Sequence, residues 1–322
     1  MTHVSKAVVT GGAGFIGSHI VDKLLERGVE TIVIDNFSTG SMGNLKQHGG
    51  NRLLRVIVGE ASRIDSLLAS ERDIDVVFHE AAIASVPKSI EDPLLVHEVN
   101  VNASLKVMTF CVDRSVKRMV FASSAAVYGV LNGVVASEDL PCSPSSPYGA
   151  SKLAVEEYLK AFRSSYGLET VALRYFNVYG PRQTVSDYSG VITVFSNRLR
   201  KRSTPVIFGD GMQTRDFVYV KDVATANMLA MEDKAADGEV FNVASGESTS
   251  LLTLFATMQR VTGVEDLLPR FDAPRKGDVR SGAASISKIR RLIGFSPSVN
   301  LEEGLASMVS ATEGNERVSV AA

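Results

Sequence analysis

The glycine-rich segment at residues 10–17, with the sequence TGGAGFIG, constrains the fold more than any other part of the chain. It follows a short apolar run and precedes a helical pattern at residues 18–27. Gly11 permits a tight turn from strand to helix, Gly14 lets a pyrophosphate approach the backbone, and Gly17 lets the helix pack closely on the strand. The free N–H groups at the start of the helix favour anionic groups. The segment therefore predicts a dinucleotide site in a parallel α/β sheet, rather than an ordinary turn.

The next apolar run ends in an acidic residue. Residues 31–34 (TIVI) are predicted to form the second strand, and Asp35 follows them. This position is close to the offset of ~20 residues at which dinucleotide-binding proteins place an acid for the ribose. The carboxylate of Asp35 would accept hydrogen bonds from the 2′- and 3′-hydroxyls and would repel a 2′-phosphate. The sequence therefore predicts NAD, rather than NADP, as the cofactor.

The composition is ordinary for a globular chain of this length. Of 322 residues, 45% are hydrophobic and 22% are charged, and the net charge of −2 gives no reason to expect nucleic acid or a membrane as a partner. The two cysteines, Cys111 and Cys142, are too few for a disulfide framework and favour a reducing cytoplasmic location. No metal site is expected.

Strand and helix patterns alternate through the first half, which predicts a Rossmann-type, doubly wound parallel sheet. The expected strands are 6–10, 31–35, 53–58, 75–79, 117–122 and 170–176, and the expected helices are 16–28, 62–71, 94–114 and 147–166. We therefore expect a dinucleotide-binding domain at residues 1–180, to which the chain returns at about 217–245 with a helix at 222–231. A smaller mixed substrate domain is expected at 181–310, followed by a flexible tail at 311–322.

Candidate catalytic residues follow from one helix and the strand before it. Ser146 and Pro147 are typical of a helix start, which places Tyr148 and Lys152 four residues apart on one face. The lysine charge and the positive end of the helix dipole would both lower the pKa of Tyr148 toward neutrality, as a general base for an alcohol requires. Ser124, after strand 117–122, could connect the phenol with a substrate oxygen. A lone Tyr-x-x-x-Lys would more often be a surface pattern, but the glycine loop in the same chain favours the catalytic interpretation.

Seven stretches together resemble a known family. The chain is similar to the extended short-chain dehydrogenases/reductases, and specifically to the NAD-dependent UDP-hexose 4-epimerases, from about residue 6 to 310. The matching stretches are TGGAGFIGSH (10–19), DNFSTG (35–40), ASSAAVYG (122–129), SPYGASK (146–152), RYFNVYGPRQ (174–183), GDGMQTRDFVYVKDV (209–223) and RKGD (275–278). The resemblance implies a catalytic role for Ser124, Tyr148 and Lys152, with Asn100 in the hydrogen-bond relay. Asn100 could instead cap or bridge within a helix.

The resemblance also implies two sets of ligand contacts. NAD contacts are implied for Gly11, Gly14, Phe15, Ile16, Asp35, Asn36, Ser38, Thr39, Gly40, Glu60, Ala61, Ala81, Ala82, Asn100, Ser123, Tyr148, Lys152 and Tyr175. UDP-sugar contacts are implied for Ser85, Lys88, Ser124, Tyr148, Asn177, Gln183, Val191, Val206, Phe208, Arg215, Arg275, Asp278 and Gly282. In the second set Asn177 offers an amide, the arginines offer paired donors for phosphate, Phe208 an aromatic face for uracil and Asp278 an acceptor for ribose. Taken singly, each has an ordinary structural explanation.

The two residues after the catalytic hydroxyl distinguish this chain from related dehydratases. The related 4,6-dehydratases carry an acid pair after the catalytic hydroxyl, whereas this chain has Ala125 and Ala126, which transfer no proton. The expected reaction is therefore oxidation and re-reduction at sugar C4 with retained NAD. The alternatives are a dehydratase or reductase, or a non-catalytic NAD-binding sensor. A glycine at 282 suggests a pocket that also admits an N-acetyl group, unless Gly282 is merely a turn residue.

Two further expectations depend on the resemblance. The family usually forms homodimers through two helices of each subunit, for which 94–114 and 147–166 are the candidates. Within the motif His79-x-Ala81-Ala82, Glu80 replaces an apolar residue, and the sequence offers no physical account of a charge there.

Overall fold

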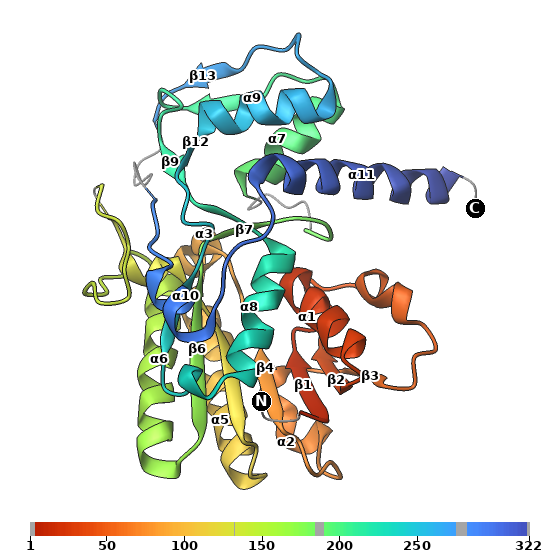
Figure 1. The fold of residues 1–322 in the computed structure, drawn as a ribbon, viewed down its shortest axis with the longest axis vertical. Coiled ribbons are helices and arrows are strands. Elements are labelled where there is room, and N and C mark those ends of the chain that lie inside the picture. The colour runs from red at the N-terminus through yellow and green to blue at the C-terminus, as the bar shows by residue number, and fades with distance from the viewer. Residues whose placement is uncertain (1–3, 132, 184–189, 275–281, 321–322) are drawn as a thin grey trace.

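The computed structural model describes residues 4–131, 133–183, 190–274 and 282–320, with side chains described up to residue 310. Its centre is a seven-stranded parallel sheet in the order β11-β6-β5-β4-β1-β2-β3 (Figure 1). The strands are β1 (Lys6–Thr10), β2 (Glu30–Asp35), β3 (Leu54–Val58), β4 (Val76–His79), β5 (Arg118–Ser124), β6 (Glu169–Tyr175) and β11 (Val240–Val243). The predicted doubly wound sheet is confirmed, and β11 is a seventh strand within the predicted return of the chain.

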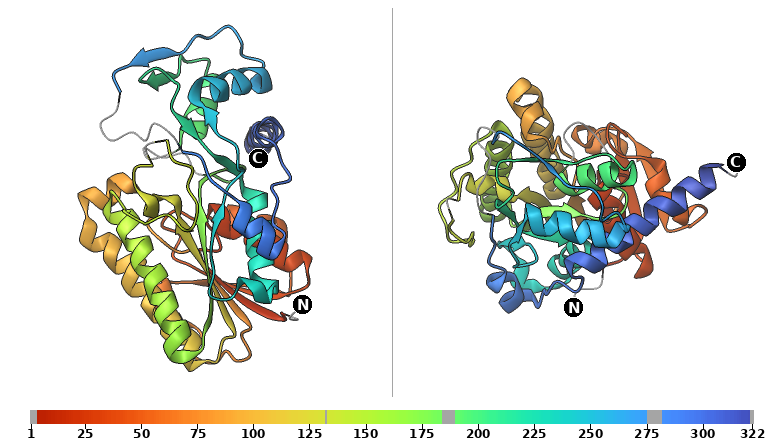
Figure 2. Two further views of the ribbon diagram at one scale, coloured as in Figure 1. Left: turned by 60° about the vertical axis from the view of Figure 1, so that its left-hand side comes forward. Right: turned by 90° about the horizontal axis from the view of Figure 1, so that it is seen from above.

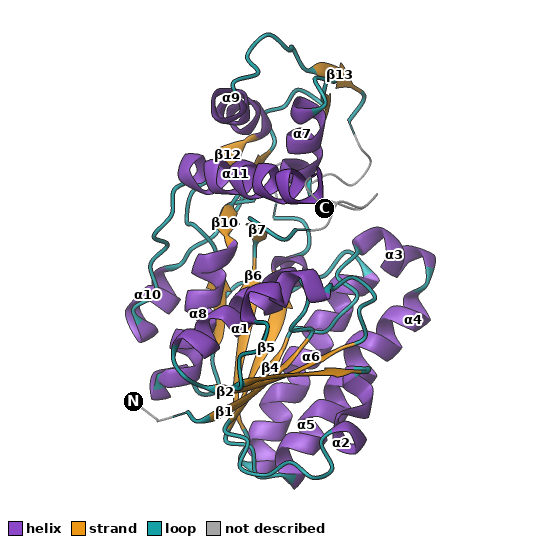
Figure 3. Cartoon of the chain, turned by 90° about the vertical axis from the view of Figure 1, so that its right-hand side faces the viewer, coloured by secondary structure: helices purple, strands orange, loops and turns teal. Residues whose placement is uncertain are grey.

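Helices cover both faces of the sheet, because its central strands are apolar on both sides. One face packs on α1 (Phe15–Glu26) and α8 (Val220–Glu232), and the other on α2 (Ile64–Leu67), α5 (Ala103–Asp113) and α6 (Pro147–Tyr166). Figures 2 and 3 show these two layers on opposite sides of the strands. The alternating side chains of β5 contribute to both cores: Val120 to one and Phe121 to the other.

Helix bounds differ from the sequence-based expectation in three places. The expected helix 94–114 is α4 (Pro93–His97), a π-helical turn η3 (Glu98–Asn102) and α5. The expected helix 62–71 is short, with η2 (Ala61–Arg63) followed by α2. An unexpected helix, α3 (Val86–Glu91), begins after Ser85, whose hydroxyl accepts a hydrogen bond from the backbone of Lys88 at 3.1 Å.

A smaller unit of mixed structure lies beyond the carboxyl edge of the sheet (Figure 1). Its own apolar core includes Phe195 and Phe255, whose ring centroids are 5.7 Å apart. The elements of this unit are β7 (Asn177–Tyr179), α7 (Val191–Arg200), β8 (Val206–Phe208), β9 (Thr214–Arg215), β10 (Phe217–Tyr219), β12 (Thr249–Ser250), α9 (Leu251–Thr262), β13 (Arg270–Asp272) and α11 (Leu301–Val320). The strands pair as β7 with β10, β9 with β12 and β8 with β13.

Two segments of the predicted C-terminal region are placed differently. Helix α10 (Ser287–Ile293) packs against β11, and Ile289 and Phe295 belong to the apolar core between the seven-stranded sheet and the layer of α1 and α8. This part of the expected domain 181–310 therefore belongs with the first unit. The expected tail 311–322 is helical as far as Val320, since α11 continues without a proline or a left-handed glycine cap. None of the helices in the described ranges is long and apolar enough to cross a membrane.

Candidate active site

The glycine loop forms a cradle in which side chains have no room. Gly11 has φ +71°, and a Cβ there would lie 2.7 Å from the backbone nitrogen of Ala81. A Cβ on Gly17 would lie 2.2 Å from the carbonyl oxygen of Gly11. Gly14 is the N-cap of α1, and no acidic side chain occupies the first turn of that helix. The loop thus leaves the backbone exposed at the helix N-terminus, which fits a pyrophosphate.

Asp35 fixes the loop that follows β2. Its carboxylate accepts hydrogen bonds from the backbone N–H of Ala13 at 3.0 Å and of Phe37 at 2.8 Å, so it joins the glycine loop to the next turn. Gly40 approaches the same carboxylate, since a Cβ there would lie 3.0 Å from Asp35 Oδ1. Each carboxylate oxygen can accept a second bond. The predicted ribose contact is compatible with this geometry and stays a prediction.

The three predicted catalytic residues lie together at the carboxyl edge of the sheet. Helix α6 begins as expected, because the Ser146 hydroxyl accepts from the backbone N–H of Gly149 at 3.1 Å. The buried Lys152 ammonium donates to the carbonyl oxygen of Ala122 at 2.7 Å and lies 5.9 Å from the centroid of the Tyr148 ring. Ser124, the last residue of β5, accepts from the backbone N–H of Ala126 at 3.2 Å, and its hydroxyl lies close enough to Tyr148 to lower the pKa of the phenol. A phenol, a hydroxyl and an ammonium therefore lie close together.

The ionisation of Tyr148 differs from the sequence-based expectation. Burial raises the pKa of Tyr148, the hydrogen bond from Ser124 lowers it, and the charge of Glu80 raises it. The net direction is opposite to the predicted decrease toward neutrality, because desolvation of the side chain opposes the phenolate. Burial also lowers the pKa of Lys152 to about 8, against the raising effects of Glu80 and Glu156.

Asn100 lies in the π-helical turn between α4 and α5, a feature often found at functional sites. Its side chain accepts from the backbone N–H of Ile83 at 2.8 Å and donates to the Ile83 carbonyl at 3.1 Å and to the Ser151 hydroxyl at 3.1 Å. Asn100 therefore fixes the loop after β4 against α6, one residue before Lys152. Its predicted role in the relay stays a prediction.

A buried ion pair joins helix α6, which carries Tyr148 and Lys152, to strand β6. It was not predicted from the sequence. Glu156 pairs with Arg174 at 2.6 Å and accepts from the Ser123 hydroxyl at 2.5 Å. Both charged side chains are almost fully buried. The spacing Tyr148, Lys152, Glu156 is four residues at each step, so the helical period could have indicated this residue. The Ser123 hydroxyl therefore donates to Glu156, and its predicted contact with the cofactor stays a prediction.

The predicted substrate residues are distributed over elements of both units. Asn177 is exposed at the start of β7 and donates to the Asp216 carbonyl at 2.9 Å. Val191 begins α7, Val206 and Phe208 lie in β8, and Arg215 lies in β9. The remaining members are Ser85 and Lys88 at the start of α3, Gln183 after β7 and the buried Gly282, while Arg275 and Asp278 lie outside the described residues.

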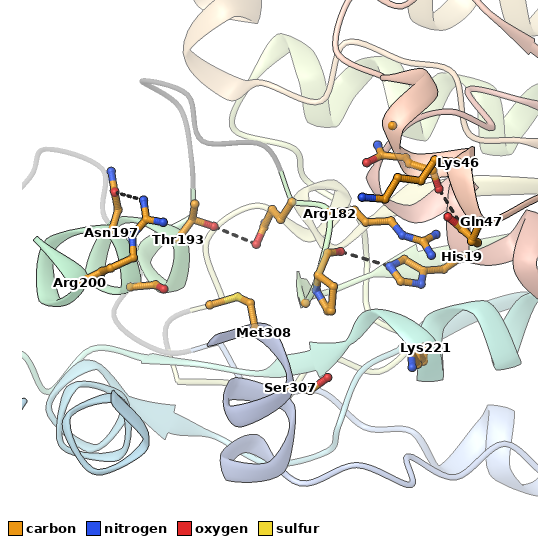
Figure 4. Close-up of a pocket in the computed structure, with 16 residues that line it drawn as sticks. His19, Lys46, Gln47, Arg182, Thr193, Asn197, Arg200, Lys221, Ser307 and Met308 are labelled. Atoms are coloured by element: carbon orange, nitrogen blue, oxygen red, sulfur yellow. Dashed lines mark hydrogen bonds between the residues drawn. The ribbon is translucent and has the colours of Figure 1, made fainter. Parts of the chain in front are cut away.

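A pocket of about 700 Å³ lies elsewhere, between α1, α7 and α11 (Figure 4). Polar and basic side chains line it, including His19 and Arg182, and Arg182 is paired with Asp22 at 2.8 Å. Of the predicted site residues that the structure describes, only Gln183 lines it, and none of the catalytic residues does. The chemistry is therefore assigned to the carboxyl edge of the sheet, where reactive groups converge, rather than to this pocket.

Comparison with known proteins agrees with this geometry. The model of the NAD dependent epimerase/dehydratase family matches residues 7–244. The chain belongs to this family. NAD is therefore its cofactor, and the glycine cradle and Asp35 fit that group. Among the described residues, no cluster of three or more His, Cys, Asp or Glu could hold a metal ion.

Three similar proteins illustrate the range of the family. A putative UDP-glucose 4-epimerase of Methanocaldococcus jannaschii is 39% identical over 311 residues, covering 96% of this chain and 99% of its own. The UDP-N-acetylglucosamine 4-epimerase of Methanobrevibacter ruminantium, solved with UDP-N-acetylmuramic acid, is 40% identical with a TM-score of 0.92, covering 98% of this chain and 100% of its own. The UDP-glucose 4-epimerase of Thermus thermophilus, solved with NAD, is 36% identical with a TM-score of 0.86, covering 96% and 99%.

Proposed function

We propose that this member of the family interconverts the C4 epimers of a UDP-hexose, by transient oxidation to a 4-keto sugar. The observation that carries the proposal is the convergence of Ser124, Tyr148 and Lys152 beside the glycine cradle. The short helix after Ser124, η4 (Ala125–Tyr128), begins with two methyl side chains. Because neither alanine can act as the acid that elimination of water requires, a dehydratase is disfavoured. The intact trio disfavours a non-catalytic sensor.

Each residue has a definite task in this reaction. Tyr148, assisted by the Ser124 hydroxyl, removes the proton of the 4-hydroxyl and later returns it. Lys152 places a positive charge beside the phenol, and the Ala122 carbonyl fixes its position. NAD, when bound, accepts the hydride from C4 and supplies it again. One base serves both epimers if the sugar turns over within the site while the diphosphate stays bound.

The substrate is proposed to be held mainly by its UDP part. The exposed amide of Asn177 and the guanidinium of Arg215, which lies in the smaller unit, are suitable donors for a diphosphate. At Gly282 a Cβ would lie 3.2 Å from the Thr214 carbonyl, so the chain passes close to β9 there. The absence of a side chain supports a pocket that accepts both plain and N-acetylated hexoses, and the relatives bear the names of both activities.

Two further proposals concern the context of the enzyme. The homodimer predicted from the resemblance is supported by exposed apolar side chains on the proposed contact helices, such as Tyr158 on α6 and Leu94 on α4, which are 42% and 82% exposed. A monomeric mass in light scattering would contradict it. The free cysteines Cys111 and Cys142 agree with a cytoplasmic location.

Proton NMR of the purified protein with UDP-galactose, without added cofactor, tests the proposed reaction. We expect UDP-glucose to appear until both epimers coexist at equilibrium, and a parallel sample with UDP-N-acetylgalactosamine to react as well. Conversion of only one pair would settle the sugar preference. If neither pair reacts even after NAD is added, the proposed function is wrong.

A further inference from the structure

Glu80 directly follows β4, and two other elements hold its side chain in place. The Tyr175 hydroxyl, at the end of β6, donates to Glu80 Oε1 at 2.9 Å. Asn227, on α8, donates to the Tyr175 oxygen at 2.8 Å and to the Val223 carbonyl at 2.9 Å. Because β5 lies between β4 and β6, with His79 paired to Phe121 and Tyr175 paired to Ser124, the Glu80–Tyr175 hydrogen bond spans the end of the strand that carries Ser124. The carbonyl of Ala122 on this strand accepts the hydrogen bond of Lys152 at 2.7 Å.

The carboxylate acts electrostatically on both titratable members of the catalytic trio. Its charge raises the pKa of Tyr148 and raises that of Lys152. Burial raises the pKa of Glu80 itself to about 7, against the lowering effects of the Tyr175 hydrogen bond and of Lys152. A carboxyl and a phenol near one ammonium form a coupled set, in which a negative charge on one opposes a negative charge on the other.

The other described charged or titratable groups around Glu80, Tyr148 and Lys152 are held in one protonation state by burial or by an ion pair. His79, on β4, is buried between the hydroxyls of Thr10 and Ser104, and burial lowers its pKa to about 3, so it stays neutral. Glu156, on α6, is neutralised by Arg174 on β6. Burial and the charge of Glu80 raise the pKa of Tyr175 well above its usual range, so it remains a donor. Within the part of the chain that the structure describes, Glu80 is therefore the titratable carboxyl group whose charge can vary and acts on Tyr148 and Lys152.

We propose that Glu80 is a positioning residue for the reaction: held by Tyr175 and Asn227, its carboxylate sets the charge balance at the Tyr148–Lys152 pair. The inference rests on the proposed function, because it takes that pair as the catalytic base. An ionised Glu80 favours the ammonium of Lys152 and opposes the phenolate of Tyr148. It thereby keeps the proton on Tyr148 until the bound ligands offset this charge.

Titration of the tyrosinate absorbance in the NAD-loaded protein tests this inference without relying on turnover. The signal of Tyr148 is obtained by subtracting the titration of a Tyr148→Phe variant. In Glu80→Gln we expect Tyr148 to ionise at a pH lower by roughly one unit, because a nearby negative charge is removed. In a pH profile of kcat/KM, the acidic limb should move in the same direction.

Two variants make the test specific. Glu157 lies on α6, the helix of Tyr148, where it is exposed and pairs with Lys160 at 2.7 Å. Glu157→Gln removes one negative charge there and should leave the Tyr148 titration unchanged. Tyr175→Phe keeps the Glu80 charge but removes the hydrogen bond that holds it, and should also shift the titration. An unchanged Tyr148 titration in folded Glu80→Gln would overturn the inference. If Glu80→Gln does not fold, an unchanged titration in Tyr175→Phe would overturn it.

The titration also separates the two proposals. A shifted tyrosinate titration in a protein that converts no UDP-hexose would leave the role of Glu80 intact and contradict the proposed reaction. Epimerisation together with an unshifted titration would contradict the role of Glu80 alone.

Discussion

Replacing Tyr148 by phenylalanine is expected to lower kcat by about 10²–10⁴-fold, the usual contribution of a general acid–base group. The substitution removes one oxygen from the point where Ser124 and Lys152 converge and leaves the ring and its packing in place. Cofactor retention and KM should change little, because the loss concerns proton transfer in the transition state rather than binding. Initial rates from the NMR assay measure this effect.

Tyr166→Phe is the matched control for this variant. Tyr166 is the last residue of the same helix and is 62% exposed, so the loss of its hydroxyl should leave kcat unchanged. If Tyr148→Phe kept more than about a tenth of the wild-type rate, general base catalysis by Tyr148 would have to be abandoned.

Replacing Gly17 by alanine is expected to abolish the retention of NAD and to destabilise the fold. The added Cβ would lie 2.2 Å from the Gly11 carbonyl oxygen, a backbone atom that can move only if the cradle is distorted. Overpacking of this kind typically costs about 1–3 kcal/mol of unfolding free energy. The cofactor released on denaturation, measured by absorbance, and the melting temperature report the two effects.

Gly190→Ala is the corresponding control, because Gly190 has φ −61° and no atom of the described residues lies within 4 Å of an added Cβ. It should retain NAD and melt close to the wild type. Full NAD retention in Gly17→Ala would show that the close approach of α1 to the glycine loop is not required for cofactor binding.

The sequence predicted the parts of this protein that depend on local signals. Helix α6 has the predicted bounds Pro147–Tyr166, because a capping serine starts it and Gly167, in the left-handed region, ends it. Strand β11 has only four residues, and its position depends on pairing with β6, so no local pattern could place it at the edge of the sheet.

The electrostatics of the site depended on contacts that are distant in sequence. Local reasoning recognised Lys152 four residues after Tyr148, but neither the desolvation of the phenol nor the charge of Glu80 is visible in that spacing. The sequence alone did not explain a charged residue at position 80, because its hydrogen-bond partner, Tyr175, lies 95 residues away. The sign of the pKa shift therefore emerged only from the structure.

The most direct test of the central claim, oxidation and re-reduction at C4 within one site, is the fate of a label at that carbon. UDP-galactose carrying deuterium at sugar C4 would be incubated with the protein in ordinary water, without added cofactor, and the product analysed by NMR. The account predicts UDP-glucose that retains deuterium at C4, because the same hydrogen is removed and returned. UDP-glucose with protium at C4 would contradict it.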